Sequence, residues 1–304
     1  MQSTKLKINS KIGMTVAPFR YLKGIESGPI VLVGFAFVAA IWIVFHGYEG
    51  IVHDSTLYLL LAMEQIAPEI YSGDMFLLAS QQSRFSLLPI ILSTVIEQFG
   101  VNRAFLGLYL TGHALWLGGM LLLFLRLTRG PALWLGLGLV AALPADYMMG
   151  LLKYGEGFVT PRIFAEALIL LALATCVSRV RVSTFLLCGL AALFHPLVAI
   201  GGMAVVIVAA SIREPRWLFL PAVALAAVLI AASLAVNPFA GLFVTIDLDW
   251  MDLIQRRNAL VVVSAWTEKD WVRLVFAAGI CLAASHALHE HLRRLVVAVL
   301  VVSV

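Results

Sequence analysis

Residues 48–76 read YEGIVHDSTLYLLLAMEQIAPEIYSGDMF and follow the first long apolar run of the chain. The stretch contains no Lys or Arg, and its acidic residues are Glu49, Asp54, Glu64, Glu69 and Asp74. The sequence on both sides of it is mostly apolar. An acidic loop that also carries aromatic residues, set between apolar segments, predicts a polar site at a membrane surface.

The composition defines the class of protein. Hydrophobic residues make up 62% of the chain and charged residues 12%, whereas soluble domains average about 45–50% and about 25%. This predicts an all-α, polytopic transmembrane bundle whose main partner is the lipid bilayer. Positive residues lie in short clusters between apolar runs, so the net charge of +4 reflects membrane topology, and no nucleic-acid partner is expected.

Apolar runs of about 20 residues are long enough to cross a bilayer. The sequence predicts helices at 29–46, 104–125, 131–146, 162–178, 183–195, 196–211, 217–236 and 271–288. A further apolar run begins at Leu295 and stops at Val304, so we expect a truncated C-terminus. Residues 1–304 then form a single transmembrane domain with about eight or nine crossings and no soluble domain.

The segment 85–100 is apolar, but it contains Pro89 and Glu97. If it does not cross, all the basic clusters between the runs fall on one side and nearly all the acidic residues fall on the other. We therefore expect a surface helix at 85–100, a cytoplasmic tail at 1–28 and a long outer loop at 47–103 that carries juxtamembrane helices. The predicted location is an inner (plasma) membrane of bacterial type.

Asp54 is the leading candidate for chemistry. It precedes the helical pattern of the first outer loop, where it could cap a helix or act as a general base or metal ligand. Tyr58 lies one turn later on the same face and could bind substrate or anchor the interface. Asp74 follows Ser72-Gly73, so a turn and a substrate contact are both open.

The second outer loop, 146–161, and the helix break after it supply further polar candidates. Glu156 lies between two glycines, and Arg162 follows Thr160-Pro161 at the start of a predicted span. An arginine at this depth needs a partner, which is either Glu166 on the same helix or an anionic substrate. His195 precedes Pro196 at a break between two short helices, where it is either a core residue or a polar ligand.

The third outer loop, 237–270, carries Arg256 and Arg257 near Asp247, Asp249 and Asp252. Basic residues on the outer side indicate an anionic partner such as a lipid phosphate, or plain headgroup contact. The DLDWMD sequence lacks the glycine and glutamate of an EF-hand, so it is a weak signal for a metal.

The order of these features resembles the GT-C superfamily of integral-membrane glycosyltransferases, including protein O-mannosyltransferases and aminoarabinose transferases of lipid A. The resemblance rests on a basic tail, one span, an outer loop with Asp54 and Tyr58, a P-x-x-Y-x-x-D element at 68–74, and Phe99-Gly100-Val101 followed by Arg103. Many members have Asp-Glu followed by Arg-Tyr in this loop, whereas this chain has His53-Asp54-Ser55-Thr56-Leu57-Tyr58. The segment Arg84-Phe85-Ser86-Leu87-Leu88-Pro89 is similar to the family's Lys-Pro-Pro-Leu segment.

The resemblance implies transfer of a sugar from a polyprenyl-phosphate donor to an acceptor at the outer face. Asp54 and Glu156 would be catalytic, with a divalent metal ion as an optional cofactor. The substrate contacts would be Tyr58, Asp74, Arg84, Arg162, His195, Arg256 and Arg257. Two alternatives remain open: a membrane transporter or lipid flippase, since broken helices also mark transport pathways, and a non-catalytic membrane subunit with the same fold.

Overall fold

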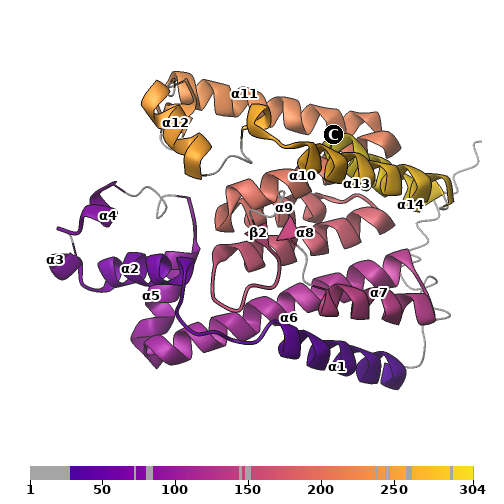
Figure 1. The fold of residues 1–304 in the computed structure, drawn as a ribbon, viewed down its shortest axis with the longest axis horizontal. Helices are drawn as coiled ribbons and strands as arrows, with labels where there is room; N and C mark the ends of the chain where they lie inside the picture. The colour runs from indigo at the N-terminus through magenta and orange to yellow at the C-terminus, as the bar shows by residue number, and fades with distance from the viewer. Residues whose placement is uncertain are drawn as a thin grey trace, which may run out of the picture.

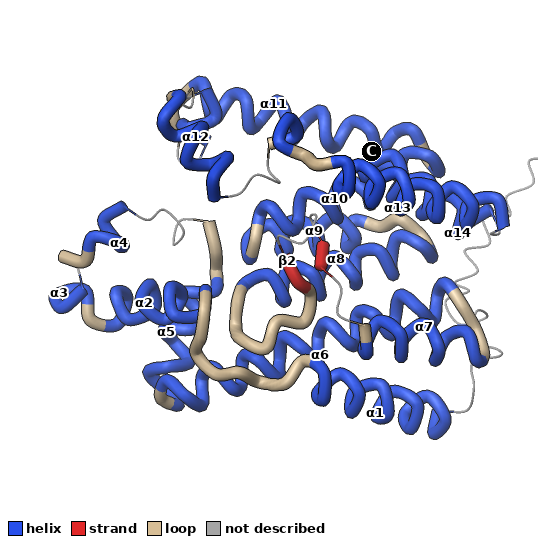
Figure 2. The backbone as a smooth tube through the Cα atoms, viewed as in Figure 1, coloured by secondary structure: helices blue, strands red, loops and turns tan. Residues whose placement is uncertain are grey.

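The structure is a computed structural model, and it describes residues 28–71, 73–79, 85–143, 146–147, 152–236, 239–243, 245, 247–257, 262–287 and 290–303. Most of these residues are helical (Figures 1 and 2). Strand is limited, in this part of the chain, to the two-residue β1 (Asp146–Tyr147) and β2 (Leu152–Lys153), which pair antiparallel. The predicted all-α class is confirmed.

The first outer loop is bounded by two long apolar helices and holds short ones. The elements are α1 (Gly28–Phe45), α2 (Asp54–Ile66), α3 (Pro68–Tyr71), α4 (Met75–Ala79), α5 (Leu88–Phe99) and α6 (Val101–Leu127). A helix is present within the segment 85–100 as α5, which packs against α2 and α6; its place at the membrane surface stays a prediction. Gly100 joins α5 to α6 with a φ of 77°, a value that glycine adopts without steric cost.

The rest of the described chain is a series of helices. They are α7 (Pro131–Ala142), α8 (Pro161–Ser178), α9 (Val182–Phe194), α10 (Pro196–Arg213), η4 (Pro215–Leu218), α11 (Phe219–Ser233), η5 (Phe239–Phe243), α12 (Leu248–Arg257), η7 (Val263–Ala265), α13 (Glu268–Ala287) and α14 (Glu290–Ser303). The break expected at His195-Pro196 is present, because α9 ends at Phe194 and α10 begins at Pro196.

Five helices among the described residues are long and apolar enough to cross a membrane. They are Gly28–Phe45, Val101–Leu127, Pro161–Ser178, Pro196–Arg213 and Pro215–Ser233. Helices α5, α7 and α9 are apolar but shorter; twelve residues of helix extend about 18 Å, against about 30 Å for a bilayer core. The chain is an integral membrane protein by this measure, and the eight or nine predicted crossings go beyond the five helices found.

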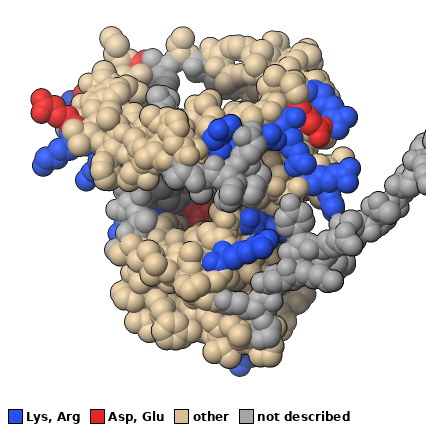
Figure 3. All heavy atoms as spheres, turned by 90° about the vertical axis from the view of Figure 1, so that its right-hand side faces the viewer, with Lys and Arg blue, Asp and Glu red and all other residues tan. Residues whose placement is uncertain are grey.

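The two ends of the bundle differ in charge. Arg126, Arg179, Arg181 and Arg213 lie at the ends of α6, α8, α9 and α10, and Lys and Arg side chains gather on the face that Figure 3 shows. The short helices α2, α3, α4 and α12 lie at the other end (Figure 1), and acidic residues occupy the first turns of α2, α3 and α12. This separation agrees with the asymmetry read from the sequence.

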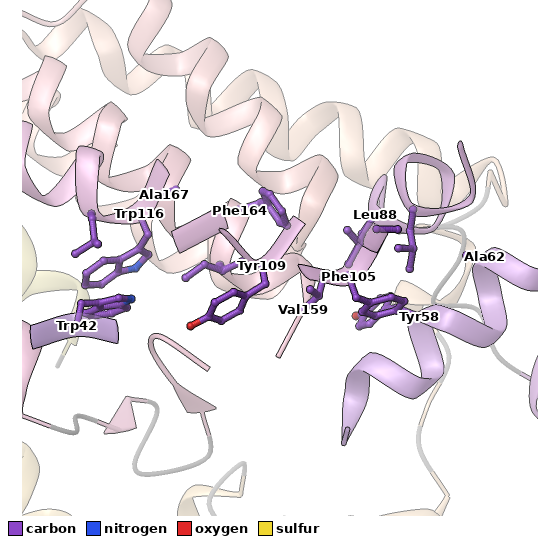
Figure 4. Close-up of a cluster of buried hydrophobic side chains, with 14 of the residues drawn as sticks. Trp42, Tyr58, Ala62, Leu88, Phe105, Tyr109, Trp116, Val159, Phe164 and Ala167 are labelled. Atoms are coloured by element: carbon purple, nitrogen blue, oxygen red, sulfur yellow. The ribbon is translucent and has the colours of Figure 1, made fainter. Parts of the chain in front are cut away.

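The main hydrophobic core lies where α1, α2, α5, α6 and α8 meet. Trp42 of α1 is 1% exposed and stacks on Trp116 of α6, with ring centroids 4.5 Å apart. Figure 4 shows this pair at one end of the cluster and Phe105, Tyr58 and Leu88 at the other. The core therefore runs along α6 from the bundle interior to the helices of the first outer loop.

Candidate functional site

Asp54 lies in the first turn of α2. Its carboxylate does not cap the helix; instead the hydroxyls of Ser55 and Thr56 donate back to the carbonyls of Val52 and His53. His53 has a φ of 49°, which is uncommon for a residue with a side chain and costs free energy. The turn that presents Asp54 is thus a strained one, as is common where a functional side chain must point in a set direction.

Three consecutive carbonyl groups of the second outer loop accept hydrogen bonds from the end of α1, from α6 and from the first outer loop. The Gly155 oxygen accepts from Nδ1 of His46 at 2.9 Å, and the Glu156 oxygen accepts from Nε2 of His113 at 3.1 Å. The Gly157 oxygen accepts from the backbone N–H of Glu49 at 2.7 Å. These bonds fix the backbone of Glu156 against α1, α6 and the start of the first loop.

The glycines on either side of Glu156 allow this close approach. Gly155 has a φ of 65°, and a Cβ there would come within 2.6 Å of the Trp42 ring. A Cβ on Gly157 would lie 2.5 Å from the Gly47 carbonyl oxygen, closer than atoms in a folded protein pack. The sequence pattern of two glycines around an acid therefore has a steric origin.

Arg162 brings the two acidic residues together. Its Nη1 lies 2.9 Å from Oδ2 of Asp54, and its Nη2 lies 2.7 Å from Oε1 of Glu156. Nε of Arg162 and the Thr160 hydroxyl both donate to Oε2 of Glu156, each at 3.0 Å. An arginine in the first turn of a helix opposes the helix dipole, and the two carboxylates offset this cost at the start of α8.

Exposure distinguishes the members of this cluster of Asp54, Glu156 and Arg162. The side chains of Arg162 and Glu156 are 12% and 13% exposed, whereas that of Asp54 is 48% exposed. Two carboxylates face one guanidinium, so the cluster carries a net negative charge when all three groups are ionised. Asp54 is therefore the member that an incoming molecule can reach.

Tyr58 and His195 lie near this cluster. Tyr58 is buried, and burial raises its pKa to about 12, so it does not anchor the surface as one prediction had it. His195 accepts the Val198 N–H with Nδ1, so the proton of its neutral ring is on Nε2. Burial lowers the pKa of His195, and the Arg162 charge lowers it further.

Sequence reasoning missed the tryptophan and histidine side chains that hold the backbone at Glu156 in place. Nε1 of Trp42 donates to Nδ1 of His113 at 2.7 Å, and this fixes the proton of the neutral ring on Nε2, facing the Glu156 carbonyl. His46 stacks on Trp42 with ring centroids 3.9 Å apart. A histidine in each of two apolar helix segments is the one signal in the sequence that could have drawn attention to these contacts.

The other predicted site residues lie elsewhere. Oδ1 of Asp74 accepts from the backbone N–H groups of Phe76 and Leu77, the turn-forming role left open above. Arg256 forms an ion pair with Asp252 of its own helix. Arg84 lies outside the described residues.

The optional divalent metal ion stays a prediction of the resemblance. Ca²⁺ takes six to eight oxygen ligands, and Mg²⁺ binds through one or two carboxylates while it keeps several waters. Among the described residues no group of three or more His, Cys, Asp or Glu side chains lies together. The Asp54 and Glu156 carboxylates both contact the guanidinium of Arg162.

The loop before α5 closes over the helix break near His195. The backbone N–H of Leu87 donates to the Leu193 carbonyl at 2.9 Å. Segments from both outer loops and from the α9–α10 break thus meet at one end of the bundle, and the cluster of Asp54, Glu156 and Arg162 lies among them. No family model, no curated protein and no solved structure matches the chain, so the site stands on its own geometry.

Proposed function

We propose that the protein is a GT-C-like membrane glycosyltransferase that moves a sugar from a polyprenyl-phosphate donor to an acceptor at the outer face. In this proposal the acid-rich end of the bundle is the outer end, the N-terminus is cytoplasmic and the chain crosses a bacterial inner membrane eight or nine times. The sugar and the acceptor are not specified by the chain.

One observation supports this proposal more than any other. Asp54 and Glu156 come from separate outer loops, more than 100 residues apart in the sequence, and both contact the guanidinium of Arg162. A transporter would be expected to gather its polar residues near the bilayer midplane. Here the polar side chains of the cluster converge at the end of the helices, and the Asp54 carboxylate is half exposed. This arrangement favours chemistry at the membrane surface.

The proposed reaction uses Asp54 as the general base. The carboxylate takes the proton of the acceptor hydroxyl, and the acceptor oxygen attacks the anomeric carbon of the donor sugar. The bond between that carbon and the phosphate oxygen breaks, and polyprenyl phosphate leaves with the electron pair. Arg162 holds the two carboxylates in place, because its Nε, Nη1 and Nη2 already donate to them.

His195 is assigned to the leaving phosphate. Its Nδ1 is occupied by the Val198 N–H, so Nε2–H is the donor that remains for a ligand. A neutral donor of this kind stabilises the negative charge that develops on the phosphate oxygen. Arg84 is a second candidate for the phosphate, on the sequence resemblance alone.

The test is sugar transfer by the full chain in lipid nanodiscs, with polyprenyl-phosphate sugars as donors and total membrane glycoconjugates as acceptors. We expect Asp54→Asn to reduce transfer by about a hundredfold or more, the usual loss when a general base is removed. Asn keeps an oxygen that can accept from Arg162, so the variant should fold. Asp54→Glu should restore part of the activity.

Asp252→Asn is the matched control, since this acid also pairs with an arginine but lies on α12. It should transfer sugar as the unchanged protein does. Equal transfer by Asp54→Asn and the unchanged protein would exclude Asp54 as the base. If the unchanged protein transferred sugar from none of the polyprenyl-phosphate donors tested, the proposed glycosyltransferase activity would be contradicted.

A further inference from the structure

Helices α6 and α8 run in the same direction and end together. Gly112 of α6 packs on Ile163 of α8, and Gly119, seven residues later, packs on Leu170, which is also seven residues later. The two helices therefore advance in step along their contact. In the same register, the last turn of α6 lies level with the last residues of α8.

Helix α10 follows α8 in the same way. Gly202 of α10 packs directly against the Ile169 side chain of α8. Further along both helices, Nη1 of Arg213 donates to the Ser178 carbonyl oxygen at 3.4 Å. Helix α8 therefore has two parallel neighbours, α6 and α10, whose last turns lie at the level of its own.

Each of the three helices has an arginine at this end. Arg126 comes seven residues after Gly119, so it falls about 20° from that glycine, on the face of α6 toward α8. Arg213 comes eleven residues after Gly202 and again falls about 20° from it, on the face of α10 toward α8. Arg179 is the first residue after α8. The three arginines therefore gather around the end of α8.

The charge of these arginines is not balanced by the described part of the chain. No ion pair found there includes Arg126, Arg179 or Arg213, and all three residues are exposed. The C-terminus of a helix carries about half a negative charge, so the three helix ends offset only about half of the three positive charges. Neighbouring helices lie about 8–10 Å apart, and the arginines repel each other unless an anion binds between them. Lys and Arg side chains gather on the face that Figure 3 shows.

Exposed apolar side chains lie on the membrane side of the arginines. Leu122, one helical turn before Arg126, is 45% exposed, and Ile212, directly before Arg213, is 44% exposed. A phospholipid carries acyl chains close to its phosphate, whereas a dissolved anion has no use for apolar surface. Arginine suits a phosphate, because its guanidinium can donate two parallel hydrogen bonds to it. The combination of positive charge and apolar surface favours a lipid over a free anion.

We propose that Arg126, Arg179 and Arg213 bind the phosphate of an anionic phospholipid in the leaflet at this end of the bundle, with its acyl chains beside Leu122 and Ile212. A headgroup with a net negative charge is preferred, because three guanidinium groups repel the ammonium of a choline headgroup. This inference does not depend on the proposed function, because the site lies at the opposite end of α8 from the proposed catalytic residues.

The experiment is a lipid titration of the full chain in detergent micelles, followed by native mass spectrometry. Dioleoyl phosphatidylglycerol and dioleoyl phosphatidylcholine are compared, because they share their acyl chains and differ in net charge. The readout is the dissociation constant of the first bound lipid. A third titration repeats the phosphatidylglycerol series in the presence of excess inorganic phosphate, which separates a lipid site from a site for any phosphate.

We expect phosphatidylglycerol to bind the unchanged protein several-fold more tightly than phosphatidylcholine, and inorganic phosphate to leave this binding intact. Arg126→Gln and Arg213→Gln should each weaken phosphatidylglycerol binding by about fivefold. Equal binding of the two lipids would overturn the proposal. Loss of lipid binding in the presence of inorganic phosphate would also overturn it, since the site would then be one for free anions.

Two further variants test the assignment to these arginines. Arg129 is exposed and lies at the same end, but it follows the end of α6 and is not on the face toward α8. Arg129→Gln should therefore leave phosphatidylglycerol binding within about twofold of the unchanged protein. Arg213→Lys keeps the charge and a donor for the Ser178 carbonyl, and it should retain most of the binding. A loss in Arg129→Gln equal to that in Arg126→Gln would refute a defined site, because only the summed charge would then matter.

Discussion

Helices α8 and α11 look alike in sequence and differ in the structure. Both are apolar segments of near-equal length that could cross a membrane, yet half of the α8 span is buried inside the protein and only 6% of the α11 span is. Helix α8 packs against α6, α9 and α10. Helix α11 leaves large side chains such as Val223, Leu225 and Ile230 mostly exposed.

The difference originates in the residues at the contacts. Gly112 and Gly119 of α6 face α8, and a Cβ at Gly112 would lie 2.8 Å from Ile163. Small residues let helices approach closely in a membrane, where burial of apolar surface alone gives no net drive. A buried polar cluster also needs closely packed helices around it. The cluster of Asp54, Glu156 and Arg162 lies at the start of α8 and not near α11.

The largest expected difference between the two regions concerns their ion pairs. Arg162→Met leaves Glu156 without its arginine in a mostly buried place, and removing one partner of such a pair costs about 3 kcal/mol of folding free energy. Arg256→Met removes an ion pair whose side chains are 75% and 55% exposed, and it should cost less than about 1 kcal/mol. Denaturant titrations in mixed micelles, followed by circular dichroism, measure both. Equal losses of folding free energy in the two variants would contradict this difference between the two regions.

Two glycines should give a smaller contrast of opposite sign. Gly157→Ala places a methyl group against the Gly47 carbonyl and the Glu49 side chain, and crowding of this kind costs about 1–3 kcal/mol. Gly279 lies within α13 with nothing within 4 Å of its added Cβ. Gly279→Ala should therefore be neutral or stabilise by up to about 1 kcal/mol. The same titration measures both, and a destabilised Gly279→Ala would show that α13 is packed more closely than described.

The smallest expected effect is on pH dependence, and it belongs to the region around α8. The pKa of His195 is lowered by burial and by Arg162, so the unfolded chain binds a proton at higher pH than the folded protein does. Stability should therefore fall as pH drops from 6.5 toward the folded pKa, by less than about 1 kcal/mol once solvent screening is included. His46 shifts in the same direction.

His195→Asn provides the comparison for this measurement. Asn can still accept the Val198 N–H and cap α10, but it does not titrate in this range. The variant should lose less stability than the unchanged protein between pH 7 and pH 5.5. An identical loss in both would show that His195 does not contribute to the pH dependence.

Local sequence patterns were enough to place the helices. Apolar runs placed α1, α6 and α8 to within a few residues, and Pro196 marked the break before α10. The segment 85–100, read as a helix apart from the spans, forms the short helix α5. The number of membrane-spanning helices was harder to predict. Helices α7 and α9 are shorter than a bilayer core, and the sequence alone does not give their tilt or depth.

The partners of the polar residues could not be predicted from local sequence patterns in the same way. Glu166 was one expected partner of Arg162, by helical spacing, whereas the structure brings in Asp54 and Glu156 from two loops. Glu166 accepts a hydrogen bond from Nε1 of Trp116. Periodicity reports only neighbours on one element, and contacts between loops depend on the tertiary packing of α1, α6 and α8.

The three carbonyl bonds at 155–157 also constrain how the protein is assembled. His46 and Gly155 are separated by 109 residues, so their bond can form only after the first outer loop, α6, α7 and the second outer loop up to Gly155 have been synthesised. Contacts of such long sequence separation carry a loop-closure entropy cost and slow folding. Among the described residues from Pro215 onward, none forms an ion pair with Asp54, Glu156 or Arg162. The cluster can therefore close on the nascent chain while α11 to α14 are still being made.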